Sequence, residues 1–168
     1  WRNIPIDNSF INAASVKAQL PIKQVIFARP ESLKDASHDE FEKHIQVALL
    51  TIEAEGFNRH ELEGFYPLSM SSRTQVYKGR LNSFEVIRYF TDLHDKDHKI
   101  STLFFHTRFS TNTAPATLMA QPFRYMAHNG ELNTDKKNRL SESAIARQNN
   151  KEVVFPSGQS DSGRLDQT

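Results

Sequence analysis

The sequence predicts an α+β domain in which helices pack against strands that follow one another along the chain. Three observations support this fold class. Apolar residues recur at three- and four-residue spacing over 39–55, which indicates a long amphipathic helix. Several short apolar runs are bounded by turn residues, as strands are. Two of these runs are adjacent with no helix between them, which a sheet of parallel strands does not allow.

The N-terminal elements are expected to be short. Residues 1–20 are irregular or extended in this interpretation, because Pro5 and Pro21 interrupt long helices. The run "VIFA", residues 25–28, predicts a buried strand that stops before Pro30.

Three helices are predicted before the C-terminal segment. The helix over 39–55 has Ser37 as its N-cap and Gly56 just beyond its end. A second helix covers 83–93, and a third, polar helix runs from residue 133 or 134 to about 148. The other predicted strands are 65–70, 74–78, 101–110 and 122–127.

Composition excludes several classes of protein. Among 168 residues, 38% are hydrophobic, and 21 basic residues nearly balance 20 acidic ones. No basic stripe indicates nucleic-acid binding, and no apolar run is long enough to cross a membrane. Cysteine is absent, which excludes disulfides, thiolate metal sites and a cysteine nucleophile within these residues, and which is typical of cytoplasmic proteins.

The stretch "HDKDH", residues 94–98, is a weak candidate for a metal site. On a helix, His94 and His98 would share a face and could bind zinc. The three charged residues between them favour a solvated loop instead, so we predict no metal.

Arg108 interrupts an apolar strand, where an unpaired charge is costly. It can form an internal salt bridge, or its guanidinium can bind a carboxylate with two hydrogen bonds. Asp161 lies at a predicted helix start, where it can cap the helix or bind an ammonium group. Asn129 and Gly130 form a simple hairpin turn, or they direct an amide and a backbone N–H at an oxyanion. A ligand with an amino-acid head and a carbonyl tail would satisfy all three stretches.

The stretch "FHTRFSTNTAPATLMAQPFRYMAHNGELNTDKKNR" closely resembles the glutaminase domain of the glutamate synthase large subunit, a class II glutamine amidotransferase. The downstream "GQSDSGRLDQ" and the upstream "WRNIPID", "QVIFARP" and "MSSRTQVYKG" resemble it too, so the similarity covers essentially all 168 residues. Other class II amidotransferases share only shorter parts of this pattern.

The resemblance implies an N-terminal-nucleophile hydrolase fold, an αββα sandwich of two antiparallel sheets between helices. It implies that Arg108 binds the α-carboxylate of L-glutamine, that Asp161 binds its α-ammonium, and that Thr111 lines the pocket. Asn129 and Gly130 would form the oxyanion hole. The reaction would be hydrolysis of L-glutamine to glutamate and ammonia, and the ammonia would then be transferred to 2-oxoglutarate.

The nucleophile of the resembled family is an N-terminal cysteine, which this chain lacks. We therefore expect residues 1–168 to be the central part of the amidotransferase domain, an internal fragment that is inactive alone. The resemblance implies FMN and an iron–sulfur cluster in the complete enzyme, with none in this chain. The implied partners are the rest of the large subunit and, where one exists, a small reductase subunit. The electron donor, nicotinamide or ferredoxin, stays open.

Two alternative functions stay open. The chain can be a non-catalytic module that binds glutamine, an interpretation that the missing cysteine favours. It can also belong to another class II amidotransferase, one that acts on a sugar phosphate or a phosphoribosyl substrate.

Overall fold

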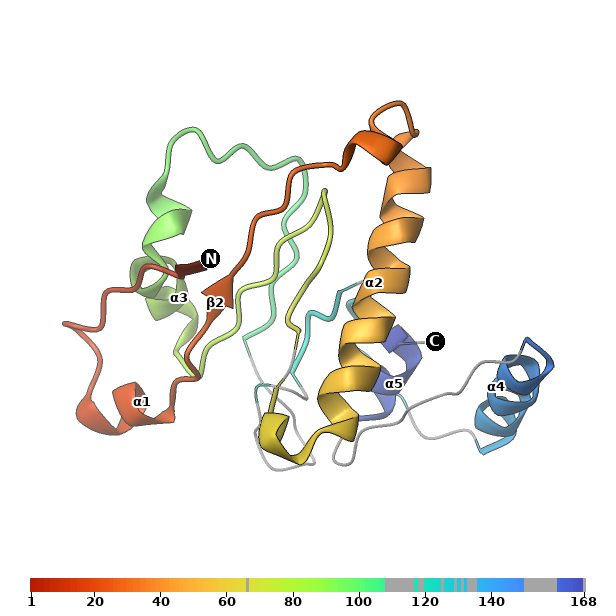
Figure 1. Ribbon diagram of the computed structural model, residues 1–168. Helices are drawn as coiled ribbons and strands as arrows, with labels where there is room; N and C mark the ends of the chain where they lie inside the picture. Colours follow the sequence, from red (N-terminus) through yellow and green to blue (C-terminus); the bar gives the residue numbers. More distant parts are fainter. Residues whose placement is uncertain are drawn as a thin grey trace.

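The computed structural model describes residues 1–65, 67–107, 117, 120–124, 126–128, 130, 132, 136–149 and 160–167. Its strands and helices are, in order, β1 (Arg2–Asn3), α1 (Ala13–Ala18), β2 (Lys23–Gln24), η1 (Glu31–Leu33), α2 (His38–Asn58), η2 (His60–Leu62), α3 (Ser83–Tyr89), η3 (Thr91–His94), α4 (Lys136–Gln148) and α5 (Asp161–Gln167). Helix α2 stands on one side of extended segments, with α1 and α3 on the other and α5 beside the lower part of α2 (Figure 1). The described structure therefore mixes α and β, with most of its regular structure helical.

A small core joins the N-terminal segment to α3. Strands β1 and β2 pair antiparallel, with Arg2 opposite Gln24. The chain then continues to an isolated antiparallel bridge between Ile6 and Phe90. Phe90 is fully buried, and its ring contacts the neighbouring Tyr89 edge-on at 4.9 Å between ring centroids. This core packs α3 against the N-terminal segment.

Helix α2 confirms the predicted helix and extends it. The Ser37 hydroxyl accepts the Glu40 N–H, and the Glu40 carboxylate accepts the Ser37 N–H, which is a complete capping box. The prediction that Gly56 lies beyond the helix is wrong, because Gly56 is buried inside α2. A Cβ at this position would lie 2.7 Å from Cδ1 of Phe65, so glycine here allows the close approach of an aromatic ring.

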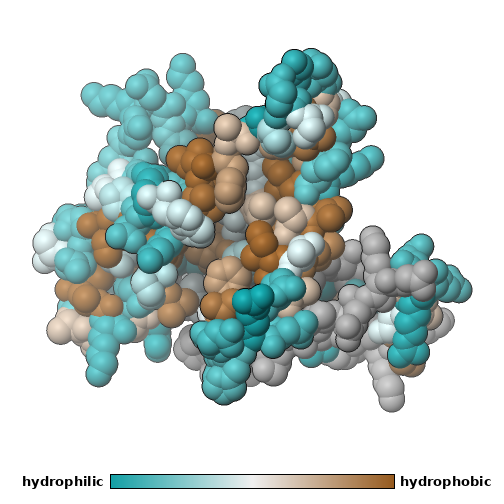
Figure 2. Space-filling model, viewed as in Figure 1, coloured by the Kyte–Doolittle hydropathy of each residue, from teal (hydrophilic) through white to brown (hydrophobic). Residues whose placement is uncertain are grey.

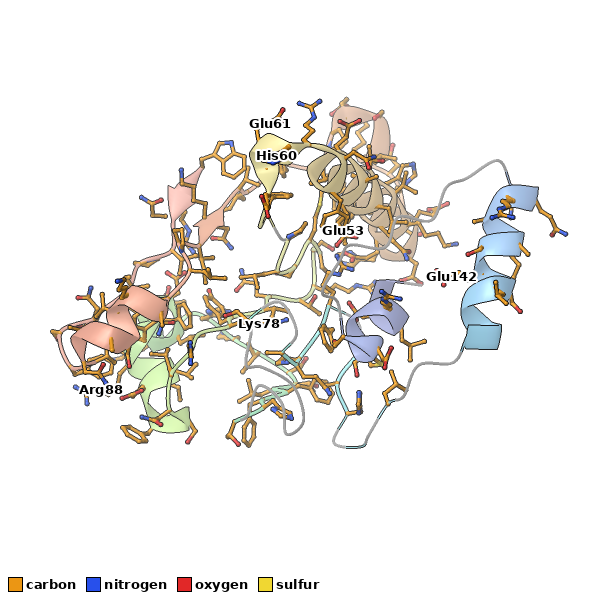
Figure 3. The ribbon with its side chains drawn as sticks, turned by 90° about the horizontal axis from the view of Figure 1, so that it is seen from below. Glu53, His60, Glu61, Lys78, Arg88 and Glu142 are labelled. Atoms are coloured by element: carbon orange, nitrogen blue, oxygen red, sulfur yellow. The ribbon has the colours of Figure 1, made fainter. Side chains whose placement is uncertain are left out.

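The later helix predictions are confirmed in part, because the second helix is α-helical only to Tyr89 and the predicted start of the third, at 133 or 134, lies outside the described residues. Helix α3 begins at Ser83, where the Glu85 carboxylate accepts the Asn82 N–H at 2.7 Å, and η3 continues the predicted segment to His94. Helix α4 ends at Gln148 as predicted and stands away from the rest of the molecule (Figures 1 and 3).

Most strand predictions are wrong. Residues 25–28, 74–78 and the described parts of 65–70 and 101–110 are not in paired strands. The side chains of Ile26 and Phe27 are 78% and 69% exposed, and Figure 2 shows apolar surface in the middle of the face that carries the extended segments. An apolar run indicates a preference for burial, whereas a strand also needs a neighbouring backbone to bond with its N–H and C=O groups. Among the described residues only β1 and β2 form a sheet, and Ile6 and Phe90 add an isolated bridge.

The predicted strand over 122–127 is a turn where it is described. The Gln121–Pro122 peptide bond is cis, and the Phe123 N–H donates to the Met126 carbonyl at 2.9 Å. This hydrogen bond brings Phe123 and Met126 together, so the chain reverses between them.

No helix in the described ranges is long and apolar enough to cross a lipid bilayer.

Candidate functional site

A pocket of about 240 Å³ lies between two stretches that the sequence analysis selected. Its walls are Phe104, Phe105, His106, Gln121, Pro122, Ala127 and His128. His106 comes two residues before Arg108, and His128 comes two residues before Gly130. The pocket therefore joins the chain that leads to Arg108 and the turn that contains Gly130.

The start of α5 belongs to the same site. Nε2 of His128 lies 2.8 Å from Oγ of Ser162, the residue after Asp161. Nδ1 of His128 accepts the Gly130 N–H at 3.2 Å. Through this ring, the turn at Gly130 and the helix start at Asp161, which are 31 positions apart in the sequence, lie side by side.

The structure describes two of the five predicted site residues. Gly130 is exposed, and among the described residues a Cβ built on it would meet Nδ1 of His128 alone, at 3.9 Å. Asp161 is half-buried and begins α5. Arg108, Thr111 and Asn129 lie outside the described residues.

The capping group of α5 is Ser160. Its hydroxyl oxygen accepts the Gly163 N–H at 3.0 Å, and its carbonyl accepts the Arg164 N–H at 3.1 Å. Asp161 is the first residue of the helix and follows the cap. The alternative that Asp161 itself is the N-cap is therefore wrong.

A buried ion network holds the pocket wall against two helices. The Arg124 guanidinium contacts the Glu53 carboxylate of α2 and lies 3.3 Å from an Asp166 oxygen of α5. The three side chains are only 7%, 2% and 2% exposed. Burial raises the pKa of Glu53 above its usual value, while Arg124 opposes that rise. Arg124 thus fixes the "AQPFR" stretch between α2 and α5.

Lys78 fixes the same stretch from the opposite side. Its Nζ donates to the Ala120 carbonyl at 2.7 Å and lies 4.9 Å from the centre of the Phe123 ring. Lys78 and Glu53 are in the middle of the molecule, between the helices (Figure 3). Burial lowers the pKa of Lys78 from 10.5 to about 8, although the carboxylate of Asp166 acts in the opposite direction.

The pKa of Lys78 predicts a pH dependence of stability. Between pH 8 and 10.5 the unfolded chain keeps the Lys78 proton that the folded chain has released, so the free energy of unfolding rises with pH. We expect wild type to gain up to about 3 kcal/mol over this range relative to Lys78→Met, which has no proton to release. Urea unfolding of both proteins at several pH values, followed by circular dichroism, measures the difference. A difference that stays constant with pH would contradict the lowered pKa.

The sequence analysis missed Gln121, Arg124 and His128 as site residues. Arg124, like Arg108, is a charged residue within an apolar run. The sequence analysis includes it in the predicted strand over 122–127 and assigns it no role in the site. His128 lies between the predicted strand over 122–127 and the predicted turn at Asn129 and Gly130. Its contact with Ser162 is 34 positions away and leaves no local pattern in the sequence.

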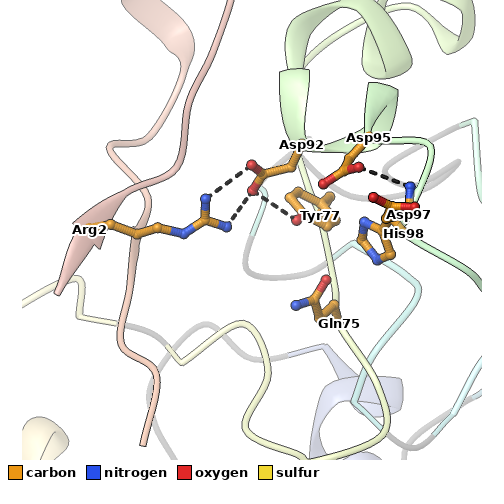
Figure 4. Close-up of a pocket in the computed structure, with 7 residues that line it drawn as sticks. All are labelled: Arg2, Gln75, Tyr77, Asp92, Asp95, Asp97 and His98. Atoms are coloured by element: carbon orange, nitrogen blue, oxygen red, sulfur yellow. Dashed lines mark hydrogen bonds and ion pairs between the residues drawn. The ribbon is translucent and has the colours of Figure 1, made fainter.

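A second pocket, of about 310 Å³, lies near α3 and η3 (Figure 4). Asp92 accepts two hydrogen bonds from Arg2, at 3.0 and 2.6 Å, and one from the Tyr77 hydroxyl at 3.2 Å.

The stretch "HDKDH" does not form a helix with both histidines on one face. His94 ends η3 and His98 lies in the following loop. Over the described residues, no group of three or more acidic, histidine or cysteine side chains is placed to hold a metal ion.

The site and the motifs around it define a class of protein. The chain matches the family described as class II glutamine amidotransferases over residues 1–168, and it belongs to that family.

Its relatives within this family include glutamate synthases. The chain is 38% identical over 136 residues to a ferredoxin-dependent glutamate synthase of Antithamnion sp., which covers 80% of this chain and 9% of the relative. It is 36% identical over 141 residues to the NADH glutamate synthase of Saccharomyces cerevisiae, covering 83% of this chain and 6% of the relative. It is 36% identical over 138 residues to the NADPH glutamate synthase large chain of Bacillus subtilis, covering 82% and 9%. The chain therefore spans less than a tenth of the length of these curated relatives, which differ in electron donor.

Proposed function

We propose that this chain is a glutamine-hydrolysing segment of glutamate synthase, which converts L-glutamine to glutamate and ammonia for transfer to 2-oxoglutarate. The observation that carries the proposal is the pair of contacts made by His128. They join the turn at Gly130 to the start of α5 beside Asp161, at the edge of a pocket. Membership of the amidotransferase family supports glutamine as the ligand.

Each end of glutamine has a partner in this proposal. Arg108 binds the α-carboxylate with two parallel hydrogen bonds, and Asp161 binds the α-ammonium. Thr111 lines the pocket. The Asn129 amide and the Gly130 N–H stabilise the negative oxygen that forms when the side-chain carbonyl is attacked. Within the part of the chain that the structure describes, a Cβ on Gly130 would meet one atom, at 3.9 Å, which is compatible with a ligand close to the backbone.

The nucleophile in this proposal comes from outside these 168 residues, which contain no cysteine. A cysteine with a free α-amine as its base attacks the amide carbon, ammonia leaves, and water hydrolyses the resulting thioester. Residues 1–168 supply substrate binding and the oxyanion hole. They form the central part of a domain for which we propose the αββα sandwich of N-terminal-nucleophile hydrolases.

The cofactors and partners follow from the same proposal. FMN and an iron–sulfur cluster would lie elsewhere in the complete enzyme, because a chain without cysteine has no thiolate to hold a cluster. The partners would be the rest of the large subunit and a small reductase subunit where one exists, in the cytoplasm.

The proposal is tested on the intact protein with L-glutamine, and with D-glutamine as the control of matched composition. We expect L-glutamine to bind and to be hydrolysed with release of ammonia, and 2-oxoglutarate to be converted to glutamate when a reductant is present. Because the configuration at Cα is inverted in D-glutamine, its ammonium and its carboxylate cannot reach Asp161 and Arg108 together, so it should bind weakly. Absence of L-glutamine binding in calorimetry would contradict the proposal.

A non-catalytic glutamine-binding module is the second candidate, which the absence of cysteine favours. The same experiment separates the two functions. Binding of L-glutamine with no release of ammonia would identify a module. Ammonia release without amination of 2-oxoglutarate would instead indicate another class II amidotransferase.

A further inference from the structure

His128 makes hydrogen bonds through its backbone and both ring nitrogens. Its backbone N–H donates to Oε1 of Gln121 at 2.6 Å. Its Nδ1 accepts the Gly130 N–H at 3.2 Å, and its Nε2 lies 2.8 Å from Oγ of Ser162. These contacts join three separate parts of the site: the "AQPFR" stretch, the Gly130 turn and helix α5.

The contact with Gly130 fixes the tautomer of the ring. A backbone N–H can only donate, so Nδ1 of His128 accepts and carries no hydrogen. In a neutral imidazole the hydrogen is then on Nε2, which donates to the Ser162 hydroxyl oxygen. Both bonds form together only in this one protonation state.

Gln121, which accepts the backbone N–H of His128, belongs to a stretch that is itself held by buried contacts. Gln121 lies between Ala120, whose carbonyl accepts from the buried Lys78, and Arg124, which is bound to α2 and α5. The backbone of His128 is therefore tied to the buried network, and its ring contacts Gly130 and Ser162.

We propose that His128 is a positioning residue that sets two independent geometries through its two ring nitrogens. Nδ1 orients the Gly130 N–H, and Nε2 orients the start of α5 and with it Asp161. The inference rests on the proposed function, in which the Gly130 N–H exchanges its bond with Nδ1 for one with the developing oxyanion, since it has a single hydrogen, and Asp161 contacts the substrate ammonium. The contact with Nδ1 holds the Gly130 turn beside the pocket until the oxyanion forms, so its loss affects mainly the transition state, whereas the position of Asp161 matters equally in the bound substrate.

Two substitutions separate the two nitrogens. The amide oxygen of asparagine is as many bonds from Cα as Nδ1, so His128→Asn keeps the acceptor for Gly130 and loses the contact with Ser162. The amide nitrogen of glutamine corresponds to Nε2, so His128→Gln keeps the donor to Ser162 and loses the acceptor for Gly130. Ser162→Ala removes the same contact as His128→Asn while leaving the ring in place.

The experiment measures glutamine-dependent ammonia release by the intact protein, with kcat and KM determined separately. Loss of one neutral hydrogen bond changes a constant by roughly two- to tenfold. We expect His128→Gln to lower kcat by this factor with KM nearly unchanged. We expect His128→Asn and Ser162→Ala to raise KM by this factor with kcat nearly unchanged.

The matched control is the pair His44→Asn and His44→Gln. His44 is exposed on α2, where its Nδ1 contacts the Glu40 carbonyl of its own helix at 2.8 Å, so both control variants should retain wild-type constants. Identical effects of His128→Asn and His128→Gln, or wild-type constants in both, would overturn the inference. If either variant fails to fold, Ser162→Ala decides, and wild-type KM in that variant also overturns it. A wild-type protein that releases no ammonia would refute the proposed function itself.

Discussion

Replacing Arg124 with leucine lowers the free energy of unfolding by about 3–5 kcal/mol, because it removes the guanidinium that contacts two buried carboxylates. Glu53 and Asp166 are each 2% exposed, so water cannot replace the guanidinium. Oε2 of Glu53 already has no hydrogen-bond partner within the described part of the chain. Urea unfolding followed by circular dichroism measures the loss.

Arg59→Leu is the matched control for this prediction. Arg59 pairs with Glu55 at 3.0 Å at the end of α2, but these side chains are 56% and 64% exposed. An exposed pair of this kind contributes no more than about 0.5 kcal/mol. The double variant Glu53→Gln with Arg124→Leu removes one uncompensated charge and should recover part of the stability. An effect of Arg124→Leu as small as that of Arg59→Leu would show that the network does not hold the fold.

Arg108→Lys should reduce glutamine-dependent turnover of the intact protein roughly ten- to a hundredfold, from the loss of one charge-assisted hydrogen bond. Lysine keeps the charge but lacks the planar fork that binds a carboxylate twice. Activity with added free ammonia should persist, because ammonia does not need the glutamine pocket. The measurement compares both activities and the melting temperature in one variant.

Arg88→Lys serves as the control for Arg108. Arg88 is exposed, its guanidinium lies 4.1 Å from the centre of the Phe10 ring, and it is far from Lys78 and Glu53 (Figure 3). Both activities of this variant should stay at the wild-type level. If Arg108→Lys instead loses both activities together with thermal stability, Arg108 forms an internal salt bridge and does not bind the substrate.

Local patterns in the sequence determined the helices. The Ser37 capping box and the apolar spacing that follows it involve residues a few positions apart, so α2 is readable without knowledge of the fold. The motifs around Arg108, Gly130 and Asp161 also identified the family, which the comparison over residues 1–168 confirms. The sequence thereby selected the chemical groups of the candidate site.

Tertiary structure decided how these groups are held. Arg124 contacts Glu53, which is 71 positions away in the sequence, and His128 contacts Ser162, which is 34 positions away. The spacing of residues within one helix or strand cannot predict contacts between such distant positions. Dependence on distant residues also explains why most strand predictions are wrong. Whether the apolar run at Ile26 and Phe27 becomes a strand depends on a partner backbone elsewhere, whereas a helix forms its hydrogen bonds within its own segment.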